Sequence, residues 1–186
     1  DMLRSKSLDR NSYDSGDWFN LLDFSLRTNG WGRGLPPERD NAASWPVQRS
    51  LLADARIAVG PEQIRTAAAH TREMLAIRNS SPLFRLRTGQ EIADRLSFHN
   101  LGPTQIPGLI VMSLKGADGV EIVTIFNATP RDQTFALDLG RGFKLHPIQQ
   151  GSSDPAVRRA AYGDGRFLTP ARTTAVFVAD GEAARR

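Results

Sequence analysis

The chain has 186 residues, enough for one full domain or one domain with an appendage, but too few for a complete (β/α)8 barrel of about 250 residues. Its 40% hydrophobic and 24% charged residues exclude a disordered chain, and no apolar run reaches the roughly 18 residues of a membrane helix. The net charge of +4 comes from Lys and Arg that are spread along the chain and interrupted by Asp and Glu. This spacing indicates a solvated surface and argues against a nucleic-acid partner.

The first twenty residues are dense in hydrogen-bonding and aromatic side chains, yet they follow neither a helical nor a strand period. Such a run cannot bury a regular apolar face. It can present polar groups and rings from a loop, which is where binding chemistry concentrates. Because the chain begins in the middle of this run, we expect it to be a piece of a larger protein.

Residues 1–60 are predicted to be irregular throughout, because turn-forming residues interrupt them at 28–34, 35–37 and 40–41. A long helix is predicted at 61–78. Gly60 and Pro61 suit its start, and Glu62 suits the positive end of the helix dipole. The helical period is carried by the following residues, with Met74 and Ile77 widening the apolar face: Ile64, Ala67, Ala68, Thr71, Leu75 and Arg78. We expect part of this apolar face to be uncovered in the chain alone.

After Pro82 the pattern changes to short strands separated by turn residues, which favours an antiparallel β-sandwich. A single helical turn is predicted at 88–94. Residues 120–127 are apolar on both faces, as in a central strand, and 115–119 and 163–165 read as hairpin turns. The predicted strands are 96–99, 109–114, 120–127, 134–139, 143–148, 166–168 and 173–178.

Several segments together resemble the pullulanase-type α-1,6-glucosidases of the α-amylase superfamily (glycoside hydrolase family 13), which include bacterial pullulanases and plant limit dextrinases. Arg-Ser-Lys-Ser-Leu-Asp-Arg-Asn-Ser-Tyr-Asp-Ser-Gly-Asp-Trp-Phe-Asn at 4–20 is similar to the segment after the eighth barrel strand of that family. The similarity continues in order along nearly the whole chain, at 31–37, 40–41, 77–88, 98–103, 106–108, 126–129, 145–147 and 170–177.

The resemblance implies an α+β fold class: the end of a (β/α)8 barrel, with its last loop and helix, followed by an all-β antiparallel C-terminal sandwich. The implied domains are 1–82 (barrel loop and helix), 83–180 (sandwich) and a frayed tail at 181–186. We expect residues 1–60 to be poorly packed without the rest of the barrel. A self-contained, fully buried domain there would contradict this expectation.

The resemblance further implies a debranching enzyme that hydrolyses α-1,6-glucosidic bonds by a retaining, two-carboxylate mechanism. In that family the nucleophile, the acid/base and a third Asp lie after the fourth, fifth and seventh barrel strands. All three would precede Asp1, and none of the chain's twenty Asp and Glu residues corresponds to them. The chain alone is therefore predicted to be inactive, with no catalytic residue of its own. The implied partners are a branched α-glucan (pullulan, amylopectin or limit dextrin) and the N-terminal catalytic barrel of the same protein.

By resemblance, the loop at 1–20 lines the glycone side of the family's cleft. Its amides and charges suit sugar hydroxyls, and its rings suit sugar faces. The alternative is that several of these side chains only hold the loop together: Arg4 could pair with Asp17, and Trp18 and Phe19 could anchor the loop. The predicted substrate-binding residues, which touch the substrate or orient those that do, are Arg4, Asp9, Asn11, Tyr13, Asp14 and Asp17.

No cofactor or metal is predicted, although the superfamily leaves calcium open. The chain has no cysteine, and its three histidines follow no metal-ligand spacing. Trp31, between glycines, reads either as a loop-packing residue or as a sugar platform. The compartment stays unknown: a bacterial protein, secreted or cytoplasmic.

Two rival functions come from other classes. A stand-alone carbohydrate-binding sandwich would need a planar aromatic strip on an exposed sheet face, whereas the predicted sandwich has no Trp and places most of its Phe residues in core-like alternation. A basic nucleic-acid binder would need an affinity that falls steeply with salt.

Overall fold

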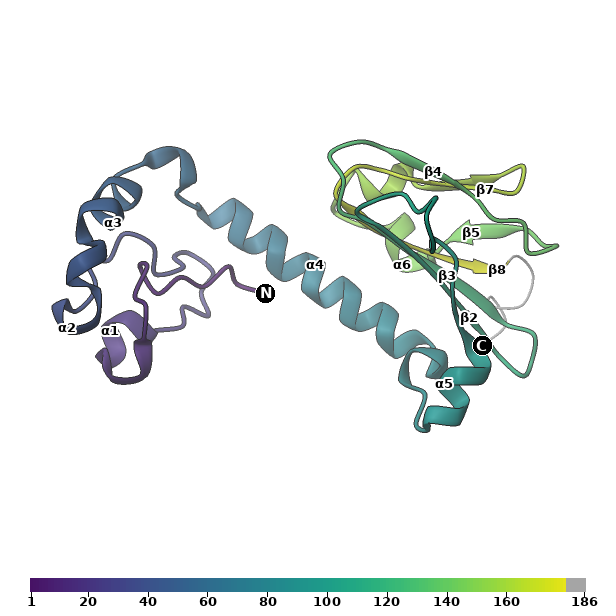
Figure 1. Cartoon of the computed structure of the whole chain (residues 1–186), viewed down its shortest axis with the longest axis horizontal. Helices are drawn as coiled ribbons and strands as arrows, with labels where there is room; N and C mark the ends of the chain where they lie inside the picture. Colours follow the sequence, from purple (N-terminus) through teal and green to yellow (C-terminus); the bar gives the residue numbers. More distant parts are fainter. Residues whose placement is uncertain (180–186) are drawn as a thin grey trace. The chain divides into compact units, whose positions relative to one another are not determined.

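The computed structural model describes residues 1–179, and its chain separates into two compact units, Asp1–Arg72 and a second unit from Glu73 onward. Figure 1 shows the helices of the first unit and the strands of the second. The frayed tail predicted at 181–186 lies outside the described residues. Within those residues, no helix has the length and apolar character needed to cross a membrane.

The first unit contains short helices where the sequence predicted only irregular chain. They are α1 (Gly16–Asn20), α2 (Glu38–Asn41) and α3 (Trp45–Leu52), with 3-10 turns at Ser12–Asp14, Ala42–Ser44 and Ala55–Ile57. The prediction of irregular chain was wrong here, although side-chain caps hold only two of the 3-10 turns and not α1, α2 or α3. Asn11 and Asp54 each accept a hydrogen bond from the backbone two residues on, and Pro46 occupies the first turn of α3.

The long helix is confirmed as α4 (Pro61–Ser80), two residues longer than predicted. A hydrogen bond closes its start, because the N–H of Gly60 donates to Oε1 of Gln63 at 3.1 Å. Ile64 and Ile77 are buried, but Leu75 is 58% exposed although it belongs to the predicted apolar period. An apolar side chain on the helix is thus uncovered, as expected.

Between α4 and the first strand lie a 3-10 turn, Pro82–Arg85, and α5 (Gly89–Arg95). The short helix at α5 was predicted, and its start is a capping box. Thr88 accepts from the backbone N–H of Glu91, and the Glu91 carboxylate accepts from the backbone N–H of Thr88.

The rest of the chain forms two antiparallel sheets, labelled in Figure 1. The first, sheet A, has the strand order β1-β2-β3-β8-β5, and the second, sheet B, has the order β4-β7-β6. Sheet A consists of β1 (Leu96–Phe98), β2 (Leu109–Lys115), β3 (Glu121–Asn127), β5 (Phe143–Leu145) and β8 (Thr173–Ala179). Sheet B consists of β4 (Gln133–Ala136), β6 (Ala161–Gly163) and β7 (Arg166–Thr169).

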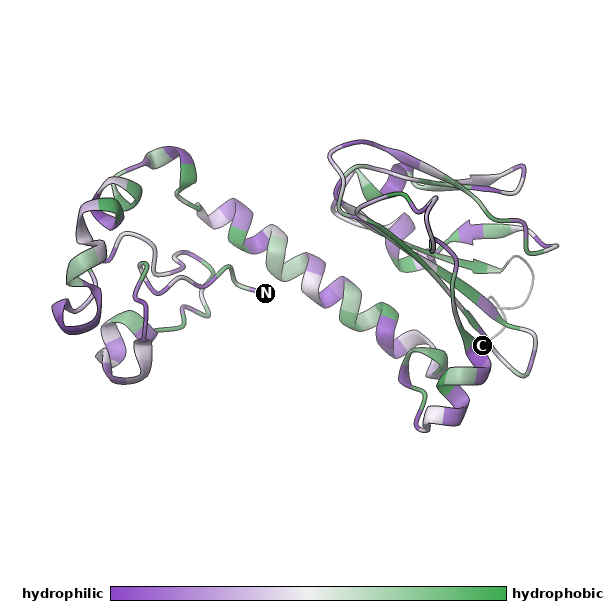
Figure 2. Ribbon diagram, in the orientation of Figure 1, coloured by the Kyte–Doolittle hydropathy of each residue, from purple (hydrophilic) through white to green (hydrophobic). Residues whose placement is uncertain are grey.

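One core lies between the two sheets, which makes them a sandwich. Phe167 of β7 is fully buried, and its ring meets those of Phe143, Tyr162 and Phe177 at centroid distances of 5.3, 4.5 and 5.0 Å. Such edge-to-face and tilted ring pairs stabilise the core beyond the effect of burying apolar area. Hydrophobic residues run along β2 and β3 (Figure 2), and β3 is central, as its two apolar faces predicted.

A second cluster covers part of the opposite face of sheet A, which we call its outer face. Met74 and Ile77 of α4 and Leu83 of the following turn pack there with Leu114 and Ile122. His146 links the same region to the helix end. Its Nδ1 accepts from the Ile148 N–H at 3.2 Å, which leaves Nε2 as the donor to the Ser80 hydroxyl at 3.1 Å.

The strand predictions are most accurate for the long strands and least accurate for the short strands at the edges of the sheets. Strand β5 ends at Leu145, not at residue 148, because His146 and Pro147 begin the short helix α6 (Pro147–Gln150). A 3-10 turn, Val157–Arg159, precedes β6, which was not predicted. Its three residues, Ala-Tyr-Gly, carry no apolar alternation.

Candidate functional site

The loop at the start of the first unit has an unusual backbone. Ser7 and Leu8 both adopt positive φ, at 53° and 64°, in a backbone region that residues other than glycine rarely occupy. Ser7 is fully buried, and its hydroxyl donates to the carbonyl of Gly34 at 2.8 Å. Consecutive residues in this region persist only where the surroundings hold them, and they concentrate at functional sites.

The carboxylate of Asp9 is the centre that holds the loop. It is 4% exposed and accepts hydrogen bonds from Nδ2 of Asn41 at 2.9 Å, from the Ser15 hydroxyl and, more weakly, from the Asn11 N–H at 3.4 Å. Burial alone would raise the pKa of Asp9. The hydrogen bonds from Ser15, Asn41 and Asn11 outweigh burial, so the pKa is lowered and the group is ionised at neutral pH.

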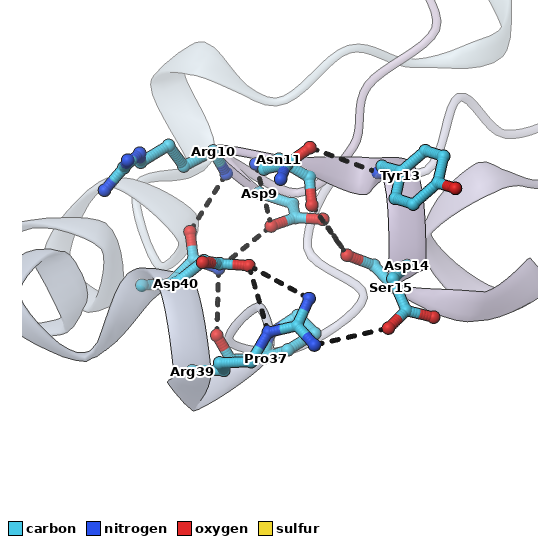
Figure 3. Close-up of polar contacts among 10 residues, drawn as sticks. Asp9, Arg10, Asn11, Tyr13, Asp14, Ser15, Pro37, Arg39 and Asp40 are labelled. Carbon is cyan, nitrogen blue, oxygen red and sulfur yellow. Dashed lines mark hydrogen bonds and ion pairs between the residues drawn. The ribbon is translucent and has the colours of Figure 1, made fainter.

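Asn41 connects this centre to the second half of the unit. Its Oδ1 accepts from the Arg10 N–H and its Nδ2 also donates to the carbonyl of Pro37, both at 2.9 Å (Figure 3). Gln48 of α3 adds a further link, because its Nε2 donates to the carbonyl of Leu8 at 3.0 Å. The loop is therefore fixed by polar contacts with residues about 30 to 40 positions away.

Trp18 and Arg33 form the second link of the loop. The Trp18 indole N–H donates to the carbonyl of Arg33 at 2.9 Å, and the Arg33 guanidinium donates to the carbonyl of Trp18 at 2.8 Å while lying 5.0 Å from the Trp18 ring centre. Arg4 donates to Asn20 at 3.0 Å and does not pair with Asp17. The proposed internal partner of Arg4 was therefore wrong.

The six predicted site residues divide into one buried group and five exposed ones. Asp9 is buried, whereas Arg4, Asn11, Tyr13, Asp14 and Asp17 are exposed. In Figure 3 the Tyr13 ring lies apart from the hydrogen bonds around Asp9, and Tyr13 is 95% exposed. Among ion pairs within residues 1–179, Asp14 is the only one of the five to take part, at 3.2 Å from Arg39. The structure thus presents these five side chains on a loop that Asp9 holds in shape.

Sequence reasoning missed the residues that build this support. Asn41 was noted as a turn residue and as part of the family resemblance but not as a support of the loop, and Gln48 and Arg33 were not singled out. Their contacts with the loop span 15 to 40 positions, so no local pattern reveals them. A buried side-chain amide must have hydrogen-bond partners, which would single out Asn41 and Gln48 if their burial were known. The sequence alone does not show that they are buried.

No group of three or more His, Cys, Asp or Glu side chains in residues 1–179 is placed to hold a metal ion. Asp23 is an example of a carboxylate used within its own loop. It accepts from the N–H and hydroxyl groups of Ser25 and of Thr28, and these hydrogen bonds lower its pKa strongly.

Many apolar side chains in residues 1–60 are left exposed. Within residues 1–60, all of which the structure describes, no Ala, Val, Leu, Ile, Met, Phe, Tyr or Trp side chain is buried. The buried residues there are Ser7, Asp9, Gly30, Pro36, Asn41 and Gln48. The exposed large apolar residues are Leu3, Tyr13, Trp18, Leu21, Leu22, Phe24, Val47, Leu51 and Ile57. This segment is held by polar contacts and has no apolar core.

The sequence matches a protein family described as "Alpha-1,6-glucosidases, pullulanase-type, C-terminal" over residues 26–180. The loop at 1–20 lies outside that match but within the similarity to individual proteins. The chain is 44% identical to chloroplastic pullulanase 1 of Arabidopsis thaliana over 194 aligned positions, which cover 96% of this chain and 20% of that protein. It is 32% identical to a pullulanase of Klebsiella pneumoniae, covering 98% and 18%.

Solved structures give the same result. A maltotriose complex of PulA from Klebsiella pneumoniae matches 97% of this chain and 21% of its own, with a TM-score of 0.87 and 35% identity. PulA from Klebsiella oxytoca matches 97% and 18%, with a TM-score of 0.85 and 32% identity. The chain therefore spans about a fifth of the length of these relatives.

Proposed function

Since the chain belongs to the C-terminal family of the pullulanase-type α-1,6-glucosidases, we propose that it supplies one wall of the substrate cleft of a starch- or pullulan-debranching enzyme. In this proposal residues 1–82 are the last loop and final helix of a catalytic barrel, and residues 83–180 are a sandwich that stabilises the barrel. The substrate is a branched α-glucan such as pullulan, amylopectin or a limit dextrin.

The observation that carries the proposal is the exposed apolar surface of residues 1–60. A segment that exposes Trp18, Phe24 and Leu22 without an apolar core lacks the usual source of folding stability, and such surface normally faces another part of a protein. In this proposal the exposed apolar surface packs against the rest of the catalytic barrel of the same enzyme. The polar links of Asp9, Asn41 and Gln48 then serve to shape the loop, not to form a core.

Within the loop, we assign Asp9 a positioning role and the five exposed residues a contacting role. The Asp9 carboxylate accepts three hydrogen bonds and is buried, so it has little surface to offer a ligand. Tyr13 offers a ring face to the C–H groups of a sugar. Arg4, Asn11, Asp14 and Asp17 offer groups that hydrogen-bond hydroxyls.

The catalytic acids are proposed to lie outside this chain. A retaining glycosidase needs a carboxylate nucleophile and a carboxylic acid whose pKa is raised so that it can protonate the leaving oxygen. Every shifted carboxyl group among residues 1–179 has a lowered pKa: Asp9, Asp23, Asp54, Glu91 and Asp132. None of them is suited to be that acid.

The proposal is tested with a fusion in which this chain replaces the C-terminal fifth of Klebsiella pneumoniae pullulanase. We expect the fusion to hydrolyse pullulan. Tyr13→Ala and Asp17→Ala should raise KM for pullulan more than they lower kcat, because they remove sugar contacts and not catalytic groups. Ser153→Ala, an exposed change in the sandwich, is the control. A fusion whose KM is unchanged by both loop substitutions would contradict the role of the loop.

A stand-alone carbohydrate-binding sandwich is the second candidate. Its supporting observation is that Phe98 and Phe126 are partly exposed on one face of sheet A. The chain alone should then be retarded in a pullulan-containing gel, and Phe98→Ala and Phe126→Ala should abolish the retardation.

A further inference from the structure

The side-chain amide of Asn20, the last residue of α1, joins separate parts of the opening loop. Its Oδ1 accepts a hydrogen bond from a guanidinium N–H of Arg4 at 3.0 Å. Its Nδ2 donates to the carbonyl of Ser12 at 2.8 Å and to the carbonyl of Gly16 at 3.1 Å. The oxygen and both N–H groups of one amide are therefore in use.

The two carbonyls that Asn20 binds lie on either side of the turn that carries Tyr13 and Asp14. Both of these side chains are exposed, and their 3-10 turn leads into α1 through Ser15. Asp9 accepts from the Ser15 hydroxyl, so it holds one point of this segment. Asn20 holds two further points, one before Tyr13 and one after Ser15.

Arg4 reaches the same amide from sixteen positions away in the sequence. Within residues 1–179, this hydrogen bond is the one polar contact that its guanidinium makes. The Asn20 oxygen carries no formal charge, so it orients one guanidinium N–H without neutralising the cation. The other N–H groups stay available to the hydroxyl oxygens of a sugar. A carboxylate in the same place would form a charge-assisted pair with Arg4 and compete with the sugar.

We propose that Asn20 is a positioning residue, which fixes the Arg4 guanidinium relative to the turn that carries Tyr13 and Asp14. This inference rests on the proposed function, in which these three side chains contact an α-glucan. One planar amide binds both parts of the loop, so the groups that they offer to a sugar keep a constant spacing. Groups held in place before binding lose less conformational freedom when the sugar arrives, so the sugar binds more tightly.

Two other roles for Asn20 fit the structure less well. A direct contact with the sugar would need a free amide group, whereas Asn20 is half-buried and its oxygen and N–H groups already have partners. A role confined to the end of α1 would explain the contact with Gly16, which lies in that helix. It would not explain the contacts with Arg4 and Ser12.

The test is a double-mutant cycle on KM for pullulan, made in the fusion with Klebsiella pneumoniae pullulanase. Asn20→Ala should raise KM several-fold and change kcat little, because it displaces sugar contacts and removes no catalytic group. Arg4→Ala should do the same. In the double variant the increase in KM should fall short of the product of the two single increases by about threefold or more, because residues in contact are coupled.

Asn41→Ala is the matched control. Asn41 also uses its amide to hold the loop, through Asp9 and the Arg10 N–H, but it does not contact Arg4. The KM increases of Asn41→Ala and Arg4→Ala should therefore multiply. If Asn20→Ala does not fold, Asn20→Asp takes its place, since it keeps the size and the acceptor of the side chain. Arg4→Ala should then raise KM less than in the parent fusion, because the carboxylate already withholds the guanidinium from the sugar.

The positioning role and the proposed function fail in different ways. A folded but inactive fusion would overturn the proposed function and, with it, the role of Asn20. An active fusion in which Asn20 is coupled to Arg4 no more strongly than Asn41 is would overturn the positioning role alone. An unchanged KM in Asn20→Ala or Arg4→Ala would do the same, and so would a loss of kcat as large as the rise in KM.

Discussion

Replacing Asp9 with Ala should release the opening loop from its support. The change removes the acceptor of three hydrogen bonds. Ser15 has a second acceptor in the carbonyl of Asn11 at 3.1 Å, so two donors are left unsatisfied: one N–H of Asn41 and the N–H of Asn11. The Asn41 donor is buried, and leaving it without a partner costs about 1–3 kcal/mol, whereas the lost 3.4 Å bond of the exposed Asn11 adds about 1 kcal/mol. We therefore expect a loss of about 2–4 kcal/mol in the local opening free energy.

The assay is hydrogen exchange at the Arg10 amide, which donates to Asn41 and therefore reports on the same link. A loss of about 2–4 kcal/mol corresponds to roughly 30- to 1,000-fold faster exchange where opening is local. Asp17→Ala is the control, because it removes an exposed carboxylate from the same segment. Equal exchange at Arg10 in both variants would refute the view that Asp9 holds the loop.

The ionised Asp9 carboxylate should also make the stability of the loop depend on pH. The pKa of Asp9 is lowered below its ordinary value of 3.8, so the folded loop favours the ionised form. Its contribution is fully present above about pH 4 and is lost as the pH falls through the folded-state pKa. As the pH falls below about 4, hydrogen exchange at the Arg10 amide, corrected for its intrinsic rate, should accelerate in the wild type. The Asp9→Ala variant should show no such acceleration.

Three further predictions concern other parts of the chain. Burial lowers the pKa of His146 below 6.5, so the unfolding free energy of the sandwich, measured in urea, should fall as the pH drops below about 6.5. His146→Gln should reduce this dependence without abolishing it, because burial also lowers the pKa of His99; an unchanged dependence would exclude His146 as its source. Phe167→Ala should cost about 3–5 kcal/mol of unfolding free energy, because it removes the ring at the centre of the fully buried aromatic cluster; a loss below about 1 kcal/mol in urea would contradict that packing. Gly30→Ala should accelerate exchange of the Ser5 amide more than Gly32→Ala does. Both glycines have positive φ, but only at Gly30 would the new Cβ meet the Ser5 carbonyl oxygen, at 2.5 Å; equal effects would show that backbone strain alone decides.

The elements that the sequence predicted well are those with a strong local signal. Strand β3 is apolar on both faces, and α4 has a proline start and a helical period, so both were found with ends correct to within two residues. Strand β6 has three residues and no alternation, and α3 has only eight residues, of which Gln48 bonds to a distant carbonyl. Elements this short give too few residues for a period to be recognised in the sequence.

The candidate loop was located from its composition, but the sequence did not show which of its residues is buried as a support and which are exposed. Asp9 and Asp14 look alike in the sequence, because both are acidic residues in a polar run. They differ only through residues 41 and 39, which the fold brings to them from beyond the loop. Burial and partner identity are tertiary properties, so the sequence predicts which segment matters and not which carboxylate supports it.

The most direct test of the central claim is pullulan hydrolysis by the fusion, measured beside the chain alone. We expect the fusion, once a single cooperative unfolding transition shows that it is folded, to release oligosaccharides from pullulan. The chain alone should release none, because we propose that the catalytic acids lie outside it. Turnover by the chain alone would contradict the absence of catalytic acids, and a folded but inactive fusion would contradict its place as the cleft wall.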